Sequence, residues 1–108
     1  MECIVIFVAC KDKQEAQSIS TKLLEEHLVA CVNIIDSVSS LFHWKGKIEQ
    51  ADEVLLSIKT TRDLFDAVRH AVKQIHSYEV PEVIAIPIVE GDVDYLDWIK
   101  RETNIKKS

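Results

Sequence analysis

The sequence predicts an α+β fold, a ferredoxin-like β-α-β-β-α-β sandwich with an extra C-terminal helix. Two helix-periodic segments each lie between strand-like apolar runs, a turn divides the central strands, and a third helical segment ends the pattern. Because crossovers between parallel strands are right-handed, the four strands form one antiparallel sheet with two helices on one face. The chain is one domain over 1–108, in which about 104–108 is expected to be a flexible tail.

The first half of the chain begins with a strand over 3–10, a continuous apolar run rich in β-branched residues. Apolar side chains then recur at helical spacing and predict a helix from about 13 to 28. The apolar run 29–35 predicts a second strand, which continues with weaker patterning to Trp44.

A long hairpin is predicted in the middle of the chain, because Gly46 of the Lys45-Gly46 pair adopts a positive φ easily. The returning strand covers about 47–59. Thr60, with Asp63 three residues later, resembles a capping box, so the second helix is expected to start there and to continue to about His76.

The last third of the chain contains the apolar run 83–89, which predicts the fourth strand. Pro87 removes one ladder donor from this strand, which indicates an edge position or a bulge. Gly91 ends the strand, and Asp92 or Asp94 can cap the third helix.

Both faces of the first strand are apolar. Ile4, Ile6 and Val8 alternate with Val5 and Phe7, and two helices can cover only one of these faces. A monomer would expose the other face, which a soluble protein avoids. The third helix covers part of it at most, so we expect an oligomer to bury the rest.

Composition excludes several classes of function. The net charge of −5 argues against nucleic acid as the partner, because phosphate binding needs clustered Lys and Arg. No apolar run approaches the ~20 residues of a membrane span. The N-terminal run lacks a basic leader, so the chain as given is expected to stay in the cytoplasm. Three cysteines without a CxxC pair fit free thiols in a reducing compartment.

Two residues are candidates for a metal site. Cys31 and His76 each lie at a helix-to-strand joint, and thiolate with imidazole suits copper or zinc. The alternatives stay open, because such a cysteine often packs in a core and such a histidine often interacts with a helix C-terminus. Strand parity places Cys3 and Cys10 on opposite faces, so they cannot share a ligand within their strand.

No catalytic arrangement is evident. Lys59, Tyr78, Glu79 and Glu82 could line a cleft, but they define no reaction, and no P-loop, dinucleotide fingerprint or nucleophile elbow occurs. Trp44 is expected to pack at a subunit interface. An enzyme is therefore the least supported class of protein.

Five motifs in the right order make the chain resemble the CutA family, the divalent-cation tolerance proteins. The matching segments are Ala30-Cys31-Val32-Asn33-Ile34, Ser40-Leu41-Phe42-His43-Trp44-Lys45-Gly46-Lys47-Ile48, Lys59-Thr60, His76-Ser77-Tyr78-Glu79-Val80-Pro81-Glu82 and Gly91-Asp92-Val93-Asp94-Tyr95-Leu96-Asp97-Trp98. The resemblance covers about 4–102. Phe42 departs from it where the family commonly has tyrosine, and the loop after Cys10 is shorter than usual.

The resemblance implies a homotrimer similar in assembly to the PII signalling proteins, with a role in tolerance of divalent metals, copper above all. It implies Cys31 and His76 as first metal ligands, with Cys10 as a secondary candidate. The leading hypothesis is therefore a trimeric copper-binding protein without an organic cofactor. The alternative is a PII-like sensor that binds a small molecule in inter-subunit clefts lined by Trp44, Lys59, Tyr78 and Glu82.

Overall fold

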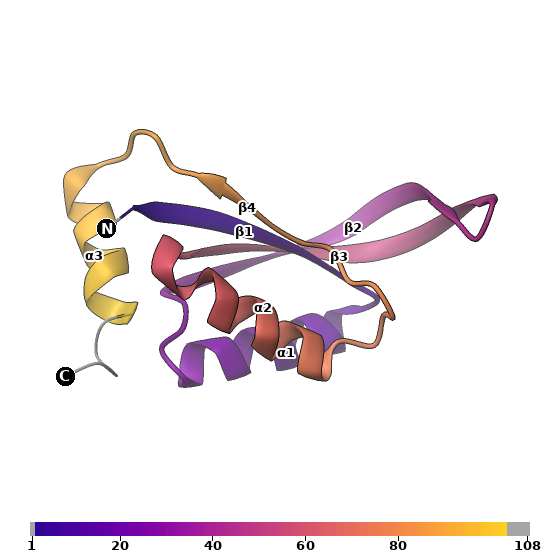
Figure 1. The fold of residues 1–108 in the computed structure, drawn as a ribbon, viewed down its shortest axis with the longest axis horizontal. Helices are drawn as coiled ribbons and strands as arrows, with labels where there is room; N and C mark the ends of the chain where they lie inside the picture. Colours follow the sequence, from indigo (N-terminus) through magenta and orange to yellow (C-terminus); the bar gives the residue numbers. More distant parts are fainter. Residues whose placement is uncertain (1, 104–108) are drawn as a thin grey trace.

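A computed structural model describes residues 2–103, and it confirms the predicted α+β fold (Figure 1). The predicted tail, 104–108, lies outside the described residues. The elements in chain order are β1 (Cys3–Cys10), α1 (Lys13–Glu25), β2 (Cys31–Trp44), β3 (Lys47–Thr61), the 3-10 turn η1 (Arg62–Leu64), α2 (Phe65–Ile75), β4 (Val83–Pro87) and α3 (Val93–Thr103). One four-stranded sheet has the order β2-β3-β1-β4, with every neighbouring pair antiparallel.

Helices α1 and α2 cover one face of this sheet, and α3 lies at the end where β1 begins (Figure 1). The core forms between the sheet and the two helices: Ile6 and Val8 of β1 are fully buried and belong to one cluster with Ile19 of α1 and Val72 of α2. Burial of apolar area on this face is the main force that holds the helices to the sheet. Among residues 2–103, no helix is both long enough and apolar enough to cross a bilayer.

The opposite face, which we call the open face, is largely uncovered by residues 2–103 and is apolar across β1 and β4. Ile84 and Ile86 of β4 are 51% and 49% exposed, and their cross-strand partners Phe7 and Val5 are half-buried. Only part of this face meets α3, where Cys3 Sγ lies 3.8 Å from the Leu96 carbonyl oxygen. The predicted exposure of one sheet face is therefore present in a single chain.

Helix α1 ends earlier than predicted, at Glu25, because the chain turns into a Schellman motif. The Leu28 N–H donates to the Leu23 carbonyl and the His27 N–H donates to the Leu24 carbonyl, both at 3.1 Å. His27 adopts the left-handed conformation that this motif needs, with φ at 56°. Its Nδ1 lies 3.2 Å from the Glu102 carbonyl oxygen, which ties this turn to α3.

The β2–β3 hairpin extends beyond the body of the molecule (Figure 1). Lys45 and Gly46 form its turn with φ of 51° and 82°, as a type I′ turn requires and as predicted. Strand β2 carries a β-bulge between Ile35 and Val38, where Ser37 has a φ of 62°. Strand β4 lies at the edge of the sheet, which explains how it accommodates Pro87.

The predicted capping box at the start of α2 is wrong. Helix α2 begins at Phe65 after the η1 turn, and among the described residues the N-cap positions of these two elements, Thr61 and Leu64, have no side-chain capping hydrogen bond. The Thr60 hydroxyl lies in β3 and donates instead to the Leu28 carbonyl at 2.6 Å. The Thr60 hydroxyl therefore makes a tertiary hydrogen bond in place of the predicted local capping bond. At α3 the prediction is confirmed, because Asp92 Oδ2 accepts the Tyr95 N–H at 3.2 Å.

Two adjacent threonines are expected to respond oppositely to valine. Both are buried, but the Thr60 hydroxyl is hydrogen-bonded and the Thr61 hydroxyl has no partner among the described residues. Thr60→Val should lower the free energy of unfolding by about 1–3 kcal/mol, whereas Thr61→Val should leave it unchanged or raise it by up to about 1 kcal/mol. Denaturant unfolding measures both, and an equal loss at the two positions would contradict the assignment.

Candidate metal centre

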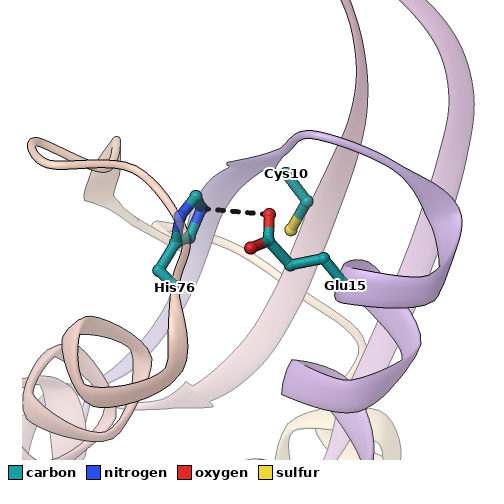
Figure 2. Close-up of side chains that lie close together, drawn as sticks. All are labelled: Cys10, Glu15 and His76. Carbon is teal, nitrogen blue, oxygen red and sulfur yellow. Dashed lines mark ion pairs between the residues drawn. The ribbon is translucent and has the colours of Figure 1, made fainter.

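Three possible metal ligands meet at the C-terminal end of β1. They are the thiol of Cys10, the carboxylate of Glu15 and the imidazole of His76, and their ligand atoms all lie within 4.8 Å of one another (Figure 2). They come from β1, from the first turn of α1 and from the residue after α2. The tertiary fold therefore assembles this cluster from three separate segments.

Local structure positions each of the three side chains. Cys10 ends β1 on the helix-covered face and pairs with Val54 of β3. Asp12 caps α1 by accepting the Glu15 N–H at 2.8 Å, so the Glu15 side chain starts from the first helical turn. His76 is the C-cap of α2, where its N–H donates to the Val72 carbonyl at 2.9 Å. Two helix termini and one strand end thus converge.

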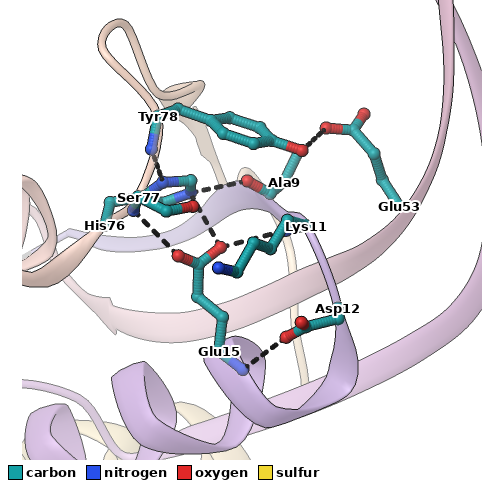
Figure 3. A network of polar contacts seen from close by, with 8 residues as sticks. All are labelled: Ala9, Lys11, Asp12, Glu15, Glu53, His76, Ser77 and Tyr78. Atoms are coloured by element: carbon teal, nitrogen blue, oxygen red, sulfur yellow. Dashed lines mark hydrogen bonds and ion pairs between the residues drawn. The ribbon is translucent and has the colours of Figure 1, made fainter.

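His76 is held by both of its ring nitrogens (Figure 3). Nε2 lies 2.8 Å from the Ala9 carbonyl oxygen, and Nδ1 lies 3.0 Å from the Tyr78 backbone nitrogen. A carbonyl only accepts and a backbone N–H only donates, so these partners assign the ring proton to Nε2 and the lone pair to Nδ1. The side chain is 0% exposed, and Nε2 is 3.9 Å from Glu15 Oε1.

Glu15 is an ionised carboxylate that ties two loops together. Oε1 accepts the Lys11 N–H at 2.9 Å and Oε2 accepts the Ser77 N–H at 2.8 Å (Figure 3). Burial alone would raise the pKa of Glu15, but these hydrogen bonds and the neighbouring His76 outweigh it and hold this pKa below its usual value. The negative charge is therefore stabilised where a cation would bind.

Cys10 is a fully buried thiol. Burial, together with the negative charges of Glu15, Glu53 and Asp12, raises the pKa of Cys10 to about 12. The thiol is thus protonated at neutral pH and unreactive toward oxidants. The negative charges of Glu15, Glu53 and Asp12 that disfavour a bare thiolate favour a cation beside it.

Tyr78 continues the network away from the cluster. Its hydroxyl donates to Glu53 Oε2 at 2.8 Å, and its ring centroid is 4.7 Å from that of His76 (Figure 3). Burial, the hydrogen bond to Glu53 and the charge of Glu53 all raise the pKa of Tyr78. The phenol therefore stays protonated and acts as a hydrogen-bond donor to β3.

The donor set fits a thiophilic or borderline metal. Thiolate, imidazole and carboxylate are the ligands of zinc and copper sites, in which sulfur and nitrogen atoms bound to one tetrahedral zinc are roughly 3.5 Å apart. The present separations of up to 4.8 Å would need small inward movements of the side chains. Magnesium and calcium prefer all-oxygen ligands, so they fit this site poorly.

Comparison with known proteins identifies the family. The model of the family described as CutA1 divalent ion tolerance protein matches residues 4–102. The chain belongs to this family. It is 43% identical over 97 residues to human Protein CutA, a match that covers 90% of this chain but only 54% of the human protein. The divalent-cation tolerance protein CutA of Thermus thermophilus is 39% identical over 99 residues, with 92% and 96% of the two chains covered.

Solved CutA structures share the fold. The Thermus thermophilus structure superposes with a TM-score of 0.92 at 39% identity and covers 94% of this chain and 98% of its own. The structure from Oryza sativa gives a TM-score of 0.93 at 41% identity and covers 95% and 94%. The description of this family and the name of the Thermus thermophilus relative both refer to tolerance of divalent cations.

Cys31, the first ligand predicted from the sequence, lies far from His76 within one chain. Cys31 pairs with Lys59, which pairs with Val5, whereas His76 contacts Ala9. Four residues along β1 correspond to roughly 13 Å. The reason is topological: β2 and β4 run antiparallel to each other, so the joints that precede them lie at opposite ends of the sheet. A metal site formed by Cys31 of one subunit and His76 of another stays a prediction.

Cys10, the secondary candidate, is the cysteine that lies beside His76. Glu15 was not predicted as a ligand. It could have been predicted to lie near Cys10, because a residue in the first turn of α1 must lie near the end of the preceding strand. Cys31 instead lies near the hydroxyl of Tyr95, whose pKa is raised by burial and by this thiol.

Three of the four predicted cleft residues line one groove. Trp44 of the hairpin faces Tyr78 and Glu82 of the segment after α2 across a groove of about 1040 Å³. Lys59 lies elsewhere, on the open face, where its ammonium group donates to Asn33 and, at 3.3 Å, to Ser57 Oγ. Within one chain Lys59 thus lies outside this groove, and a cleft formed between subunits stays a prediction.

Proposed function

We propose that this CutA family member binds copper or zinc at Cys10, Glu15 and His76 as part of its role in divalent cation tolerance. The observation that carries the proposal is the convergence of three ligand atoms within 4.8 Å in a buried site. A thiol, an imidazole and an ionised carboxylate supply the neutral and anionic donors that such a metal prefers. The fourth coordination position is left for solvent or for another protein group.

Copper is the metal that we expect first, in agreement with the resemblance to copper-linked CutA proteins. Copper(II) stands above zinc in the affinity order of nitrogen and oxygen sites, and copper(I) binds thiolates well. Direct titration of the full chain under reducing conditions, with a competing chelator, compares the two metals. No measurable binding of either metal would contradict the proposed function.

We also propose that the working protein is a homotrimer. The open face with Ile84 and Ile86 leaves an apolar sheet surface uncovered in one chain, and β4 and β2 present two free sheet edges. The number of subunits, three, is taken from the resemblance to the CutA family. Cytoplasmic localisation and the absence of enzymatic activity stay predictions.

The second candidate function is a small-molecule sensor, and the groove favours it. The groove is lined by the aromatic rings of Phe42, Trp44 and Tyr78 together with Glu49 and Glu82. Carboxylates and aromatic faces suit an organic cation rather than a nucleotide. A thermal-shift screen with metals and with organic cations separates the two candidates, because only the true ligand raises the Tm.

Substitution of the cluster tests the metal site. Cys10→Ser and His76→Gln should each weaken copper and zinc binding by about 100-fold or more, since each removes a direct ligand and loss of even an outer-shell partner costs 10–100-fold. Cys3→Ser is a matched control, because Cys3 is also buried in β1 but faces the other side of the sheet. His70→Gln controls for binding at an exposed imidazole.

The Cys31→Ser variant separates the structure-based site from the sequence-based one. Unchanged affinity in Cys31→Ser, with loss in Cys10→Ser, supports the cluster. Loss in Cys31→Ser with unchanged affinity in Cys10→Ser would contradict the cluster and favour a site shared between subunits.

A further inference from the structure

The only lone pair of the His76 ring already accepts a hydrogen bond. Nδ1 accepts the Tyr78 N–H at 3.0 Å, while Nε2 holds the ring proton and donates it to the Ala9 carbonyl at 2.8 Å. A neutral imidazole has no further lone pair in its plane. His76 therefore cannot ligate a metal without changing at least one of these two bonds.

Both ways of ligating a metal break the bond from Tyr78. If Nδ1 binds the metal, the Tyr78 N–H loses its acceptor directly. If Nε2 binds, the ring proton moves to Nδ1, where it faces the Tyr78 N–H donor. The bond to Ala9 is lost as well in the second case. The hydrogen bond between residues 76 and 78 is thus incompatible with a metal on either nitrogen.

The loop 77–82 depends on the cluster for its position. Besides the Tyr78 N–H, the Ser77 N–H donates to Glu15 Oε2 at 2.8 Å. A third hydrogen bond joins the loop to the rest of the protein: the Tyr78 hydroxyl donates to Glu53 Oε2 at 2.8 Å. Glu53 belongs to β3, so this link joins the loop to the hairpin (Figure 3). The same loop forms one wall of the groove, and Glu53 lies in the lining of that groove.

We propose that metal binding by His76 displaces the loop 77–82, and that the Tyr78–Glu53 hydrogen bond carries this displacement to the β2–β3 hairpin. The metal centre and the groove then form one coupled unit, in which the groove differs between the metal-free and metal-loaded protein. This inference rests on the proposed metal site. It concerns what the site controls rather than what it binds.

Zinc titration followed by NMR and amide hydrogen exchange tests the coupling on the full chain. In the metal-free protein, the 15N shifts of His76 should report a proton on Nε2. With zinc, exchange of the amide of residue 78 should rise by about five- to tenfold, as expected for loss of one ordinary hydrogen bond. The amide signals of residues 51–53 should shift at the same zinc concentration.

The Tyr78→Phe variant removes the link to the hairpin but keeps the backbone N–H. Zinc should still accelerate exchange of the amide at position 78, whereas the zinc-dependent shifts at 51–53 should be lost. Glu53→Gln leaves an uncharged amide oxygen as the acceptor, which weakens this hydrogen bond and should reduce the same shifts. Phe42→Tyr, a change on the hairpin outside this link, should leave them as in the wild type.

The outcomes separate this inference from the proposed function. If zinc does not bind, or if Cys10→Ser and His76→Gln bind it as the wild type does, the metal site itself is wrong. If zinc binding requires both Cys10 and His76 but the amide exchange at position 78 stays unchanged, the coupling is overturned and the metal site stands. Persistent shifts at 51–53 in Tyr78→Phe would overturn the assigned route.

Discussion

Ile86→Glu is expected to convert the assembled protein into monomers. Ile86 is 49% exposed in β4, lies on the open face and pairs with Val5 of β1. In an assembly that buries this face, a carboxylate at position 86 would lie unpaired among apolar side chains. Leaving a buried charge uncompensated costs about 3–5 kcal/mol, which corresponds to a more than 100-fold weakening of association. Light scattering at micromolar concentration measures the change.

Leu24→Glu is the matched control for this substitution. Leu24 is a similarly sized aliphatic residue with 40% exposure, but it lies on α1, on the other side of the sheet. Its substitution should leave the assembly intact. A wild-type monomer at micromolar concentration, or a trimeric Ile86→Glu variant, would contradict burial of the open face.

Affinity for zinc is expected to rise about tenfold per pH unit between pH 7 and 9. Burial and nearby negative charges raise the pKa of Cys10 to about 12, so the metal-free thiol is fully protonated throughout this range. Binding to the thiolate must then release this proton, and each released proton makes binding tenfold tighter per unit of rising pH. Glu15 adds nothing to the slope, because its lowered pKa keeps it ionised.

Competition titrations with a chelator of known pH dependence measure this slope, and a pH indicator measures the released proton directly. Cys10→Ser should lose both the affinity and the proton release. An affinity that is flat from pH 7 to 9 in the wild type would show that the thiol does not bind as thiolate, and it would remove Cys10 from the ligand set.

The elements themselves were largely predictable from local patterns. The β-branched run gave β1 its bounds, and Lys45-Gly46 located the hairpin turn, because backbone conformation at these positions depends on nearby residues. The end of α1 was not predictable in the same way. His27 in the left-handed conformation, where glycine is usual, is stabilised by contact with Glu102, a residue distant in the sequence.

The candidate metal site was only half predictable for a similar reason. Residue chemistry at the two helix-to-strand joints identified Cys31 and His76, and the family resemblance added Cys10, but neither decides which cysteine meets the histidine. That choice depends on strand direction: the end of β1 and the start of β4 meet at the same end of the sheet, and Cys10 lies there. Since the antiparallel order was already predicted, the pairing of Cys10 with His76 could have been derived from it.

The bulge in β2 determines where this family can change length. Asp36 and Ser37 together face the single residue Val54, while Ile35 and Val38 keep their partners Leu55 and Glu53. Loss of Ser37 would therefore straighten the strand without exchanging its two faces. A single insertion or deletion elsewhere in the paired part of the hairpin would turn every following side chain to the opposite face. Over evolutionary time, single-residue length differences in this hairpin should accumulate at the bulge and at the turn.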